Sequence, residues 1–184
     1  MEQLMDLLTG YGVWGLAVVA FVEASFFPVP PDVLLIPLAL MQPSLALVYA
    51  VVTTLSSTAG GLFGRWIGLK AGRPLLARFA SGKRIQEVET WFERYGGWAV
   101  AFAALTPVPY KVFTIAAGVF RVPVLPVLWG SLGGRAVRFF FEALVIMFLG
   151  EKALDFLARY TGPLTLAGGL LLVAWLVWRR RRRA

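Results

Sequence analysis

The chain has 184 residues, of which 59% are hydrophobic and only 15% are charged. Soluble domains are about 45–50% apolar and about 25% charged, so this composition excludes an ordinary soluble domain and predicts an integral membrane protein. The sequence contains no cysteine and no histidine, which excludes thiolate chemistry and removes the commonest general base and metal ligand. We therefore expect no catalytic residue, no metal site and no cofactor, and hence no enzyme.

The net charge is +8, and most of the basic residues gather in two places. Seven lie between Arg65 and Arg94, and five arginines stand at 179–183, directly after Trp178. Basic clusters that adjoin apolar spans mark the cytoplasmic side of a membrane protein. We interpret both clusters in this way rather than as contacts to nucleic acid. No nucleic-acid partner is therefore expected, and the C-terminus is placed in the cytoplasm.

The first apolar run leads into FVEASFFPVPPDVLL at 21–35, in which Glu23 and Asp32 stand on either side of a proline cluster. The cluster consists of Pro28, Pro30 and Pro31. Proline lacks the backbone donor of a helix and clashes with the preceding turn, so this cluster ends a helix. The freed carbonyl groups cost several kcal/mol in hydrocarbon unless protein or water satisfies them. We predict a re-entrant hairpin here, with a kinked spanning helix as the alternative, followed by a span at 44–64.

The same order of elements recurs in the second half of the chain. YGVWGLAVVAF at 11–21 resembles YGGWAVAFAAL at 95–105, and PVPPDV at 28–33 resembles PVPYKV at 107–112. The second proline motif is formed by Pro107 and Pro109. GGLFGR, which ends at Arg65, is more loosely similar to SLGGR, which ends at Arg135. The sequence thus predicts two repeats, each a re-entrant helical hairpin followed by a transmembrane helix.

Between the repeats, RIQEVETWFERY at 84–95 places apolar residues at helical spacing and charged residues at most other positions. This pattern indicates an amphipathic helix that lies in the membrane interface, or equally a connector helix packed on the domain. With both basic clusters in the cytoplasm, the two hairpins enter the membrane from opposite sides. The repeats are then inverted in topology, as in many transporters.

The chain is therefore predicted to form a single all-α membrane domain over 1–184. Its parts are repeat 1 at about 10–69, an amphipathic connector at about 70–95, repeat 2 at about 96–150, a C-terminal transmembrane helix at 162–178 and a basic tail at 179–184.

Six ionisable residues remain within the apolar segments: Glu23, Asp32, Lys111, Arg135, Arg138 and Glu142. Each costs about 2.5–3.5 kcal/mol at the centre of a spanning helix, so their presence indicates a polar interior. The last three share one helix face because their spacing is i, i+3, i+7. If the two hairpin tips meet near the midplane, all six can line one cavity.

The charges of these six residues sum to zero. Protonation of Glu23 or Asp32 would leave a net positive cavity that can hold an anionic headgroup, which is our hypothesis for proton coupling. The alternative is that the charges are structural latches, with Arg138 and Glu142 as an i, i+4 pair and Lys111 reaching the membrane interface.

Four motifs together resemble the DedA family, the bacterial relatives of eukaryotic VTT-domain (SNARE-associated Golgi) proteins. They are E-x-x-x-x-P-x-P-P-D at 23–32, GGLFGRWIG at 60–68, TPVPYKVFTIAAG at 106–118 and GGR at 133–135, and the resemblance runs from about residue 10 to 160. It implies a multi-pass protein of the bacterial inner membrane with two facing re-entrant hairpins, linked to moving undecaprenyl phosphate or phospholipid between leaflets. It also implies functional roles for the paired carboxylates Glu23 and Asp32 and for Arg135.

The chain departs from the family pattern in three places, one of which is the short spacing between Glu23 and Asp32. Many members have an arginine where this chain has Lys111, and lysine lacks the bidentate fork that arginine offers a phosphate. Many also carry an arginine shortly before the second proline motif, where this chain reads AFAALTP.

These observations favour a transporter or scramblase of a phosphate-bearing lipid. In this interpretation Lys111, Arg135 and Arg138 bind the headgroup. The carboxylates that couple transport to protons are Glu23, Asp32 and Glu142. A proton-coupled transporter of a small solute or cation and a non-transporting membrane organiser are the alternatives. The expected partners are membrane lipids and protons, and self-association into a homo-oligomer is left open.

Overall fold

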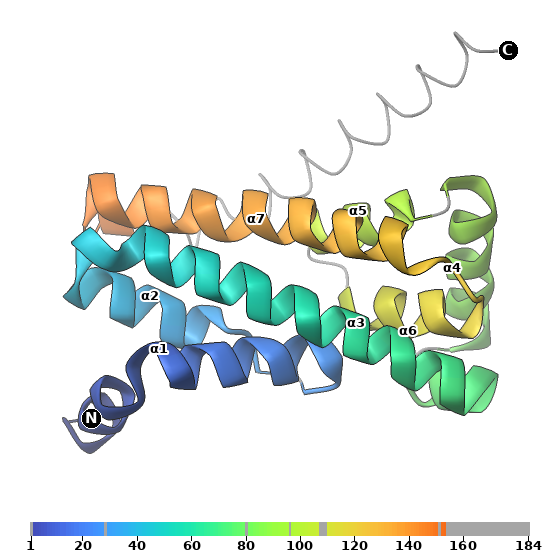
Figure 1. Ribbon diagram of the computed structural model, residues 1–184, viewed down its shortest axis with the longest axis horizontal. Helices are drawn as coiled ribbons and strands as arrows, with labels where there is room; N and C mark the ends of the chain where they lie inside the picture. Colours follow the sequence, from blue (N-terminus) through green and yellow to red (C-terminus); the bar gives the residue numbers. More distant parts are fainter. Residues whose placement is uncertain are drawn as a thin grey trace, which may run out of the picture.

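The computed structural model describes residues 2–27, 29–79, 81–95, 97–106, 110–150 and 152–153. All regular elements in these ranges are helices, as predicted (Figure 1). They are α1 (Glu2–Ser25), α2 (Asp32–Met41), the short 3-10 helix η1 (Pro43–Leu45), α3 (Ala46–Phe79), α4 (Gly82–Tyr95), α5 (Trp98–Leu105), α6 (Tyr110–Val119) and α7 (Val124–Leu149). The predicted C-terminal helix at 162–178, the basic tail and three of the predicted break residues, Pro28, Pro107 and Pro109, lie outside the described residues.

Two long helices, α3 and α7, lie side by side and run in opposite directions through the length of the molecule (Figure 1). α7 has 26 residues, so it is about 39 Å long at 1.5 Å per residue and exceeds the roughly 30 Å of a hydrocarbon core. Among the described residues, the segment Pro43–Gly72 is the one that is both long and apolar enough to cross a membrane, although buried helices of soluble proteins pass the same test. The predicted span at 44–64 lies within it, and the chain kinks at Gly72, where the backbone is not helical, before α3 ends at Phe79.

The shorter helices cover the two halves of this long pair. α1 and α2 pack on one half, and α4, α5 and α6 pack on the other (Figure 1). Each half has its own apolar cluster, one that includes Leu16, Leu35 and Ile146 and one that includes Phe113 and Ile115.

Both proline motifs separate two helices. α1 ends at Ser25 and α2 begins at Asp32, while α5 ends at Leu105 and α6 begins at Tyr110. α2 and α6 have 10 residues each and α5 has 8, so these helices are about 15 Å and 12 Å long. None of the three is long enough to cross roughly 30 Å of hydrocarbon alone. The re-entrant course of the chain, its inverted repeat and its topology stay predictions.

The amphipathic connector forms a helix, α4, and its apolar face packs on the domain. Val88 and Phe92 are buried in the same cluster as Phe113. Trp91 stacks on Phe102 of α5, with 4.7 Å between the ring centres. The segment therefore packs on the domain, and its location in the membrane interface stays a prediction.

The long helix α3 packs on α6 through glycine. A Cβ atom added at Gly68 would lie 2.0 Å from the carbonyl oxygen of Ile115, and one added at Gly118 would lie 2.0 Å from the carbonyl oxygen of Arg65. Lipid tails are as apolar as leucine, so the burial of apolar side chains does not drive helices together in a membrane. Such helices associate largely through close approaches at small residues. These two glycines therefore allow α6 to pack closely on α3.

Arg65 holds α3 to the turn before α7. Its Nε and Nη2 groups donate hydrogen bonds to the carbonyl oxygen of Val122, at 2.8 Å and 2.6 Å. Hydrogen bonds from a charged donor contribute about 1.5–3 kcal/mol. We expect Arg65→Met to lower the thermal unfolding temperature in detergent, and Lys70→Met, at an exposed position of the same helix, to leave it close to wild type. Equal unfolding temperatures for Arg65→Met and wild type would contradict this role.

Candidate functional site

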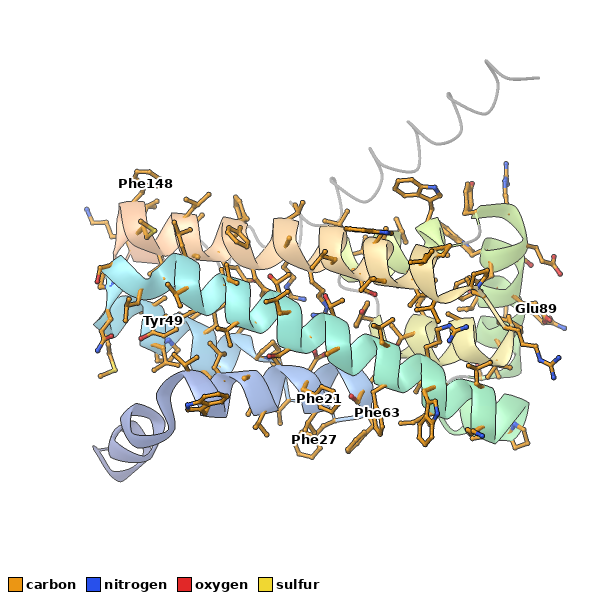
Figure 2. The ribbon with its side chains drawn as sticks, in the orientation of Figure 1. Phe21, Phe27, Tyr49, Phe63, Glu89 and Phe148 are labelled. Carbon is orange, nitrogen blue, oxygen red and sulfur yellow. The ribbon has the colours of Figure 1, made fainter. Side chains whose placement is uncertain are left out.

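The molecule has polar groups inside and apolar groups outside. Arg135 and Glu142 of α7 are only 2% exposed, whereas Phe148 of the same helix is 82% exposed. Figure 2 shows Phe148 projecting outward from α7, and Phe21, Phe27 and Phe63 gathered on the outer face of α1 and α3. Large exposed apolar surfaces mark contact with a membrane or a partner, and ionisable groups in membrane segments face the interior of the bundle. The distribution of side chains is that of a protein surrounded by lipid.

Arg135 contacts a helix beside each of the two proline motifs. Its Nη2 donates to Glu23 Oε2 at 3.2 Å, and its guanidinium carbon lies 4.0 Å from the centre of the Tyr110 ring. Glu23 stands two residues before the end of α1, and Tyr110 is the first residue of α6. A single buried arginine therefore contacts the helix before the first break and the helix after the second.

Arg138 joins α7 to the other side of the first break. Its Nη2 donates to Asp32 Oδ2 at 2.5 Å, and its Nε donates to Glu142 Oε1 at 3.2 Å. Asp32 is the first residue of α2. The i, i+4 pair expected from the latch alternative is thus present, but Arg138 also bridges to a carboxylate that is 106 residues away in the chain.

Among the described residues, ion pairs join five of the six predicted charges, and Lys111 is placed differently. Its Nζ donates to the backbone carbonyl oxygen of Phe27 at 3.0 Å. Phe27 belongs to the non-helical segment between α1 and α2, so Lys111 links the two breaks directly. The five paired residues carry three negative and two positive charges, and Lys111 at the edge brings the sum of all six to zero.

Eight buried side-chain atoms of the described residues have no hydrogen-bond partner there. They are Asp32 Oδ1, Thr54 Oγ1, Ser57 Oγ, Thr58 Oγ1, Tyr110 Oη, Ser131 Oγ, Arg135 Nε and Glu142 Oε2. Folded proteins leave few such atoms, because each unsatisfied buried group costs about 1–3 kcal/mol. Five of the eight are hydroxyl groups and one is a guanidinium N–H. The other two are carboxylate oxygens, of Asp32 and Glu142, so six of these groups can donate to the acceptor oxygens of an anion and two can only accept.

Sequence reasoning did not single out the hydroxyl groups or Tyr110. Thr54, Ser57 and Thr58 lie at i, i+3 and i+4 in α3, so they share one helix face. Gly61 continues this face, and a Cβ atom there would lie 2.1 Å from Tyr110 Oη. These small polar residues stand at helical spacing within the apolar run 44–64, and this spacing alone predicts a polar face on the helix.

Comparison with known proteins agrees with the motifs. Residues 27–148 match the VTT domain family. An uncharacterized protein of Haemophilus influenzae is 35% identical over 145 residues, which cover 77% of this chain and 76% of that protein. Undecaprenyl phosphate transporter A of Bacillus subtilis is 23% identical over 194 aligned residues, which cover 98% of this chain and 95% of the transporter. No solved structure matches the chain.

The family match extends over α2 to α7 and so contains Asp32, Lys111 and the three charged residues of α7, whereas Glu23 lies just before it. The match covers about two thirds of the chain, and the Haemophilus relative is similar over three quarters of its own length. The chain therefore belongs to the VTT-domain family of membrane proteins, the family that its motifs resemble.

Proposed function

We propose that this protein moves a phosphate-bearing lipid between the leaflets of the bacterial inner membrane, as a multi-pass transporter or scramblase. The observation that carries the proposal is Arg135, a buried arginine that contacts a helix beside each break and whose Nε–H has no partner among the described residues. A relative over nearly the whole chain is named for transport of undecaprenyl phosphate, which agrees with this assignment.

The donor groups around Arg135 fit a phosphate better than a neutral or cationic solute. Arginine binds phosphate through parallel N–H donors, and Arg135 has one donor held by Glu23 and another without a partner. Tyr110 Oη and Ser131 Oγ supply further donors on the neighbouring helix and on α7 itself. Lys111 adds positive charge beside the first break, where it donates to the Phe27 carbonyl, while Arg138 is paired with Asp32 and Glu142. A phosphate held here would sit between the two predicted hairpins.

The helix breaks supply a route for such a headgroup. Backbone that leaves the helix at membrane depth is tolerated where it lines a polar cavity, and many transporters bind their substrates at broken helices near the midplane. The two breaks approach each other through Lys111 and Phe27, and Arg135 contacts both adjoining helices. We infer that the headgroup crosses between the leaflets along this junction while its hydrocarbon chains stay in the bilayer.

Reconstitution into liposomes tests the proposal. Purified protein is inserted into vesicles that carry, in separate preparations, a fluorescent phospholipid or a fluorescent polyprenyl phosphate. We expect the label to become accessible to a membrane-impermeant quencher faster than in vesicles without protein. A fluorescent diacylglycerol, which has the chains but no phosphate, serves as the ligand control. Rates equal to those of empty vesicles for both phosphate-bearing lipids would contradict the proposal.

Glu23→Gln and Asp32→Asn are expected to remove the dependence of lipid movement on a pH gradient. In the proposed mechanism a proton on Glu23 releases Arg135 for the phosphate, and a proton on Asp32 removes one of the two carboxylates that hold Arg138. The amides keep the shape of the side chains but cannot change charge. The measurement compares lipid movement with and without an imposed pH difference, with Glu87→Gln on the exposed face of α4 as the control. If both amide variants respond to the gradient as the wild type does, these carboxylates do not couple transport to protons.

A further inference from the structure

A groove of about 570 Å³ lies between α5 and the first half of α7. Trp98, Ala101 and Leu105 line it from α5, and Leu125, Trp129 and Gly133 are among the residues that line it from α7. All of these side chains are apolar. The volume falls within the range of about 300–1,000 Å³ that is typical of sites for small organic ligands.

Glycine residues of α7 shape this groove in two ways. Gly134 allows close packing on α5, since a Cβ atom there would lie 2.5 Å from the Cβ atom of Ala104. Close packing does not explain the glycine at position 133, because a Cβ atom there would meet nothing within 4 Å. A glycine inside a helix is less favourable than alanine by about 0.8–1.0 kcal/mol. The missing side chain at Gly133 has one evident effect, which is to keep the groove open.

The inner end of the groove adjoins the candidate site. Leu105 is followed by Thr106, at the start of the second break, and Gly134 is followed by Arg135. Arg135 is almost fully buried and its Nε–H has no partner among the described residues. The groove thus runs from Trp98, at the beginning of α5, to the residues next to the buried arginine.

We infer that this groove holds a hydrocarbon chain of the lipid whose phosphate Arg135 binds, an inference that rests on the proposed function. An apolar hollow on the outer face of a membrane protein is in contact with hydrocarbon. Because Arg135 carries a positive charge beside the groove, we expect the chain in it to belong to an anionic lipid. Trp98 and Trp129 are 46% and 65% exposed at the rim, where large rigid rings can pack along a chain. The groove then fixes the lipid by its chain while the headgroup reaches the junction of the breaks.

Photocrosslinking tests this inference. The full-length protein is placed in phosphatidylcholine vesicles that contain phosphatidic acid with a diazirine in one acyl chain, and the adducts are mapped by mass spectrometry. We expect adducts on α5 and on the first half of α7 in the wild type, and loss of most of this labelling in Gly133→Leu. Leucine favours a helix more than glycine does, and its Cβ atom would meet nothing within 4 Å at this position, so the variant is expected to fold.

Val137→Leu is the matched control, because Val137 lies one turn further along the exposed face of α7 and does not line the groove. Its labelling should equal that of the wild type. Unchanged groove labelling in Gly133→Leu, or adducts spread evenly over all outer faces, would overturn the inference. If groove labelling depends on Gly133 but no phosphate-bearing lipid crosses the bilayer in the transport assay, the proposed function fails and the chain site stands. If lipid crosses at the wild-type rate in Gly133→Leu, the transport proposal stands and the chain site fails.

Discussion

Arg135→Gln is expected to abolish lipid movement in reconstituted vesicles. The substitution removes the positive charge and the unpaired N–H donor at the junction of the two breaks. It also removes the contact of the guanidinium with the Tyr110 ring, which lies 4.0 Å away. Arg135→Lys keeps the charge but lacks the fork of donors, so we expect it to retain only a small part of the activity. The rate of lipid movement in vesicles with equal amounts of inserted protein measures both effects.

A loss of activity in Arg135→Gln must be separated from a loss of folding. Removing one partner of a buried ion pair costs about 3–5 kcal/mol, because the remaining charge is left without compensation. The double variant Glu23→Gln, Arg135→Gln leaves no unpaired charge at this pair, and we expect its thermal unfolding temperature to return toward that of the wild type. We expect its transport to remain absent, since the phosphate has lost its donor. Transport at the wild-type rate in the folded double variant would show that Arg135 is a latch and not a headgroup site.

Gly68→Leu is expected to have the largest effect on folding. A Cβ atom at this position would lie 2.0 Å from the carbonyl oxygen of Ile115, and backbone atoms cannot move aside as a flexible side chain can. Overpacking costs about 1–3 kcal/mol where neighbours can adjust, and we expect the upper end of this range or more here. α6 would be displaced from α3, and with it Tyr110 and Lys111 at the second break.

The measurement for Gly68→Leu is the fraction of protein that remains monodisperse in detergent, together with its thermal unfolding temperature. Gly133→Ala is the matched control in the other long helix, because its added Cβ atom meets nothing within 4 Å. Alanine favours a helix more than glycine does, so this control should be as stable as the wild type or more stable. Wild-type stability in Gly68→Leu would show that α3 and α6 do not depend on this close approach.

The local elements could be predicted from the sequence because their causes are local. The proline cluster at 28–31 lacks backbone donors, and α1 and α2 lie on either side of it. The segment 84–95 has apolar residues at helical spacing and forms α4. The three charges of α7 share a face because their spacing is fixed by the helix. In each case neighbouring residues determine the outcome.

The pairing of the charges could not be predicted in the same way. Glu23 and Arg135 are 112 residues apart, and nothing in either motif says that Glu23 pairs with Arg135 rather than with Arg138. The choice depends on the rotation of α7, which is set in part by the close packing of Gly134 on Ala104 of α5. The partner of Lys111 is a backbone carbonyl, which carries no signature in the sequence. Close approach of helices, and not the pattern of any one of them, decides these contacts.

The two arginines of α7 differ in how many carboxylates they bind, and this difference makes them respond unequally when a carboxylate of the first helix pair, α1 and α2, is neutralised. Arg138 binds both Asp32 and Glu142, so neutralising Glu142 leaves α2 tethered through Asp32. Arg135 binds Glu23 as its carboxylate partner, so neutralising Glu23 removes the ion pair that joins the end of α1 to α7. A single proton on Glu23 thus leaves Arg135 without a carboxylate partner, whereas a single proton on Asp32 leaves Arg138 paired with Glu142 of its own helix.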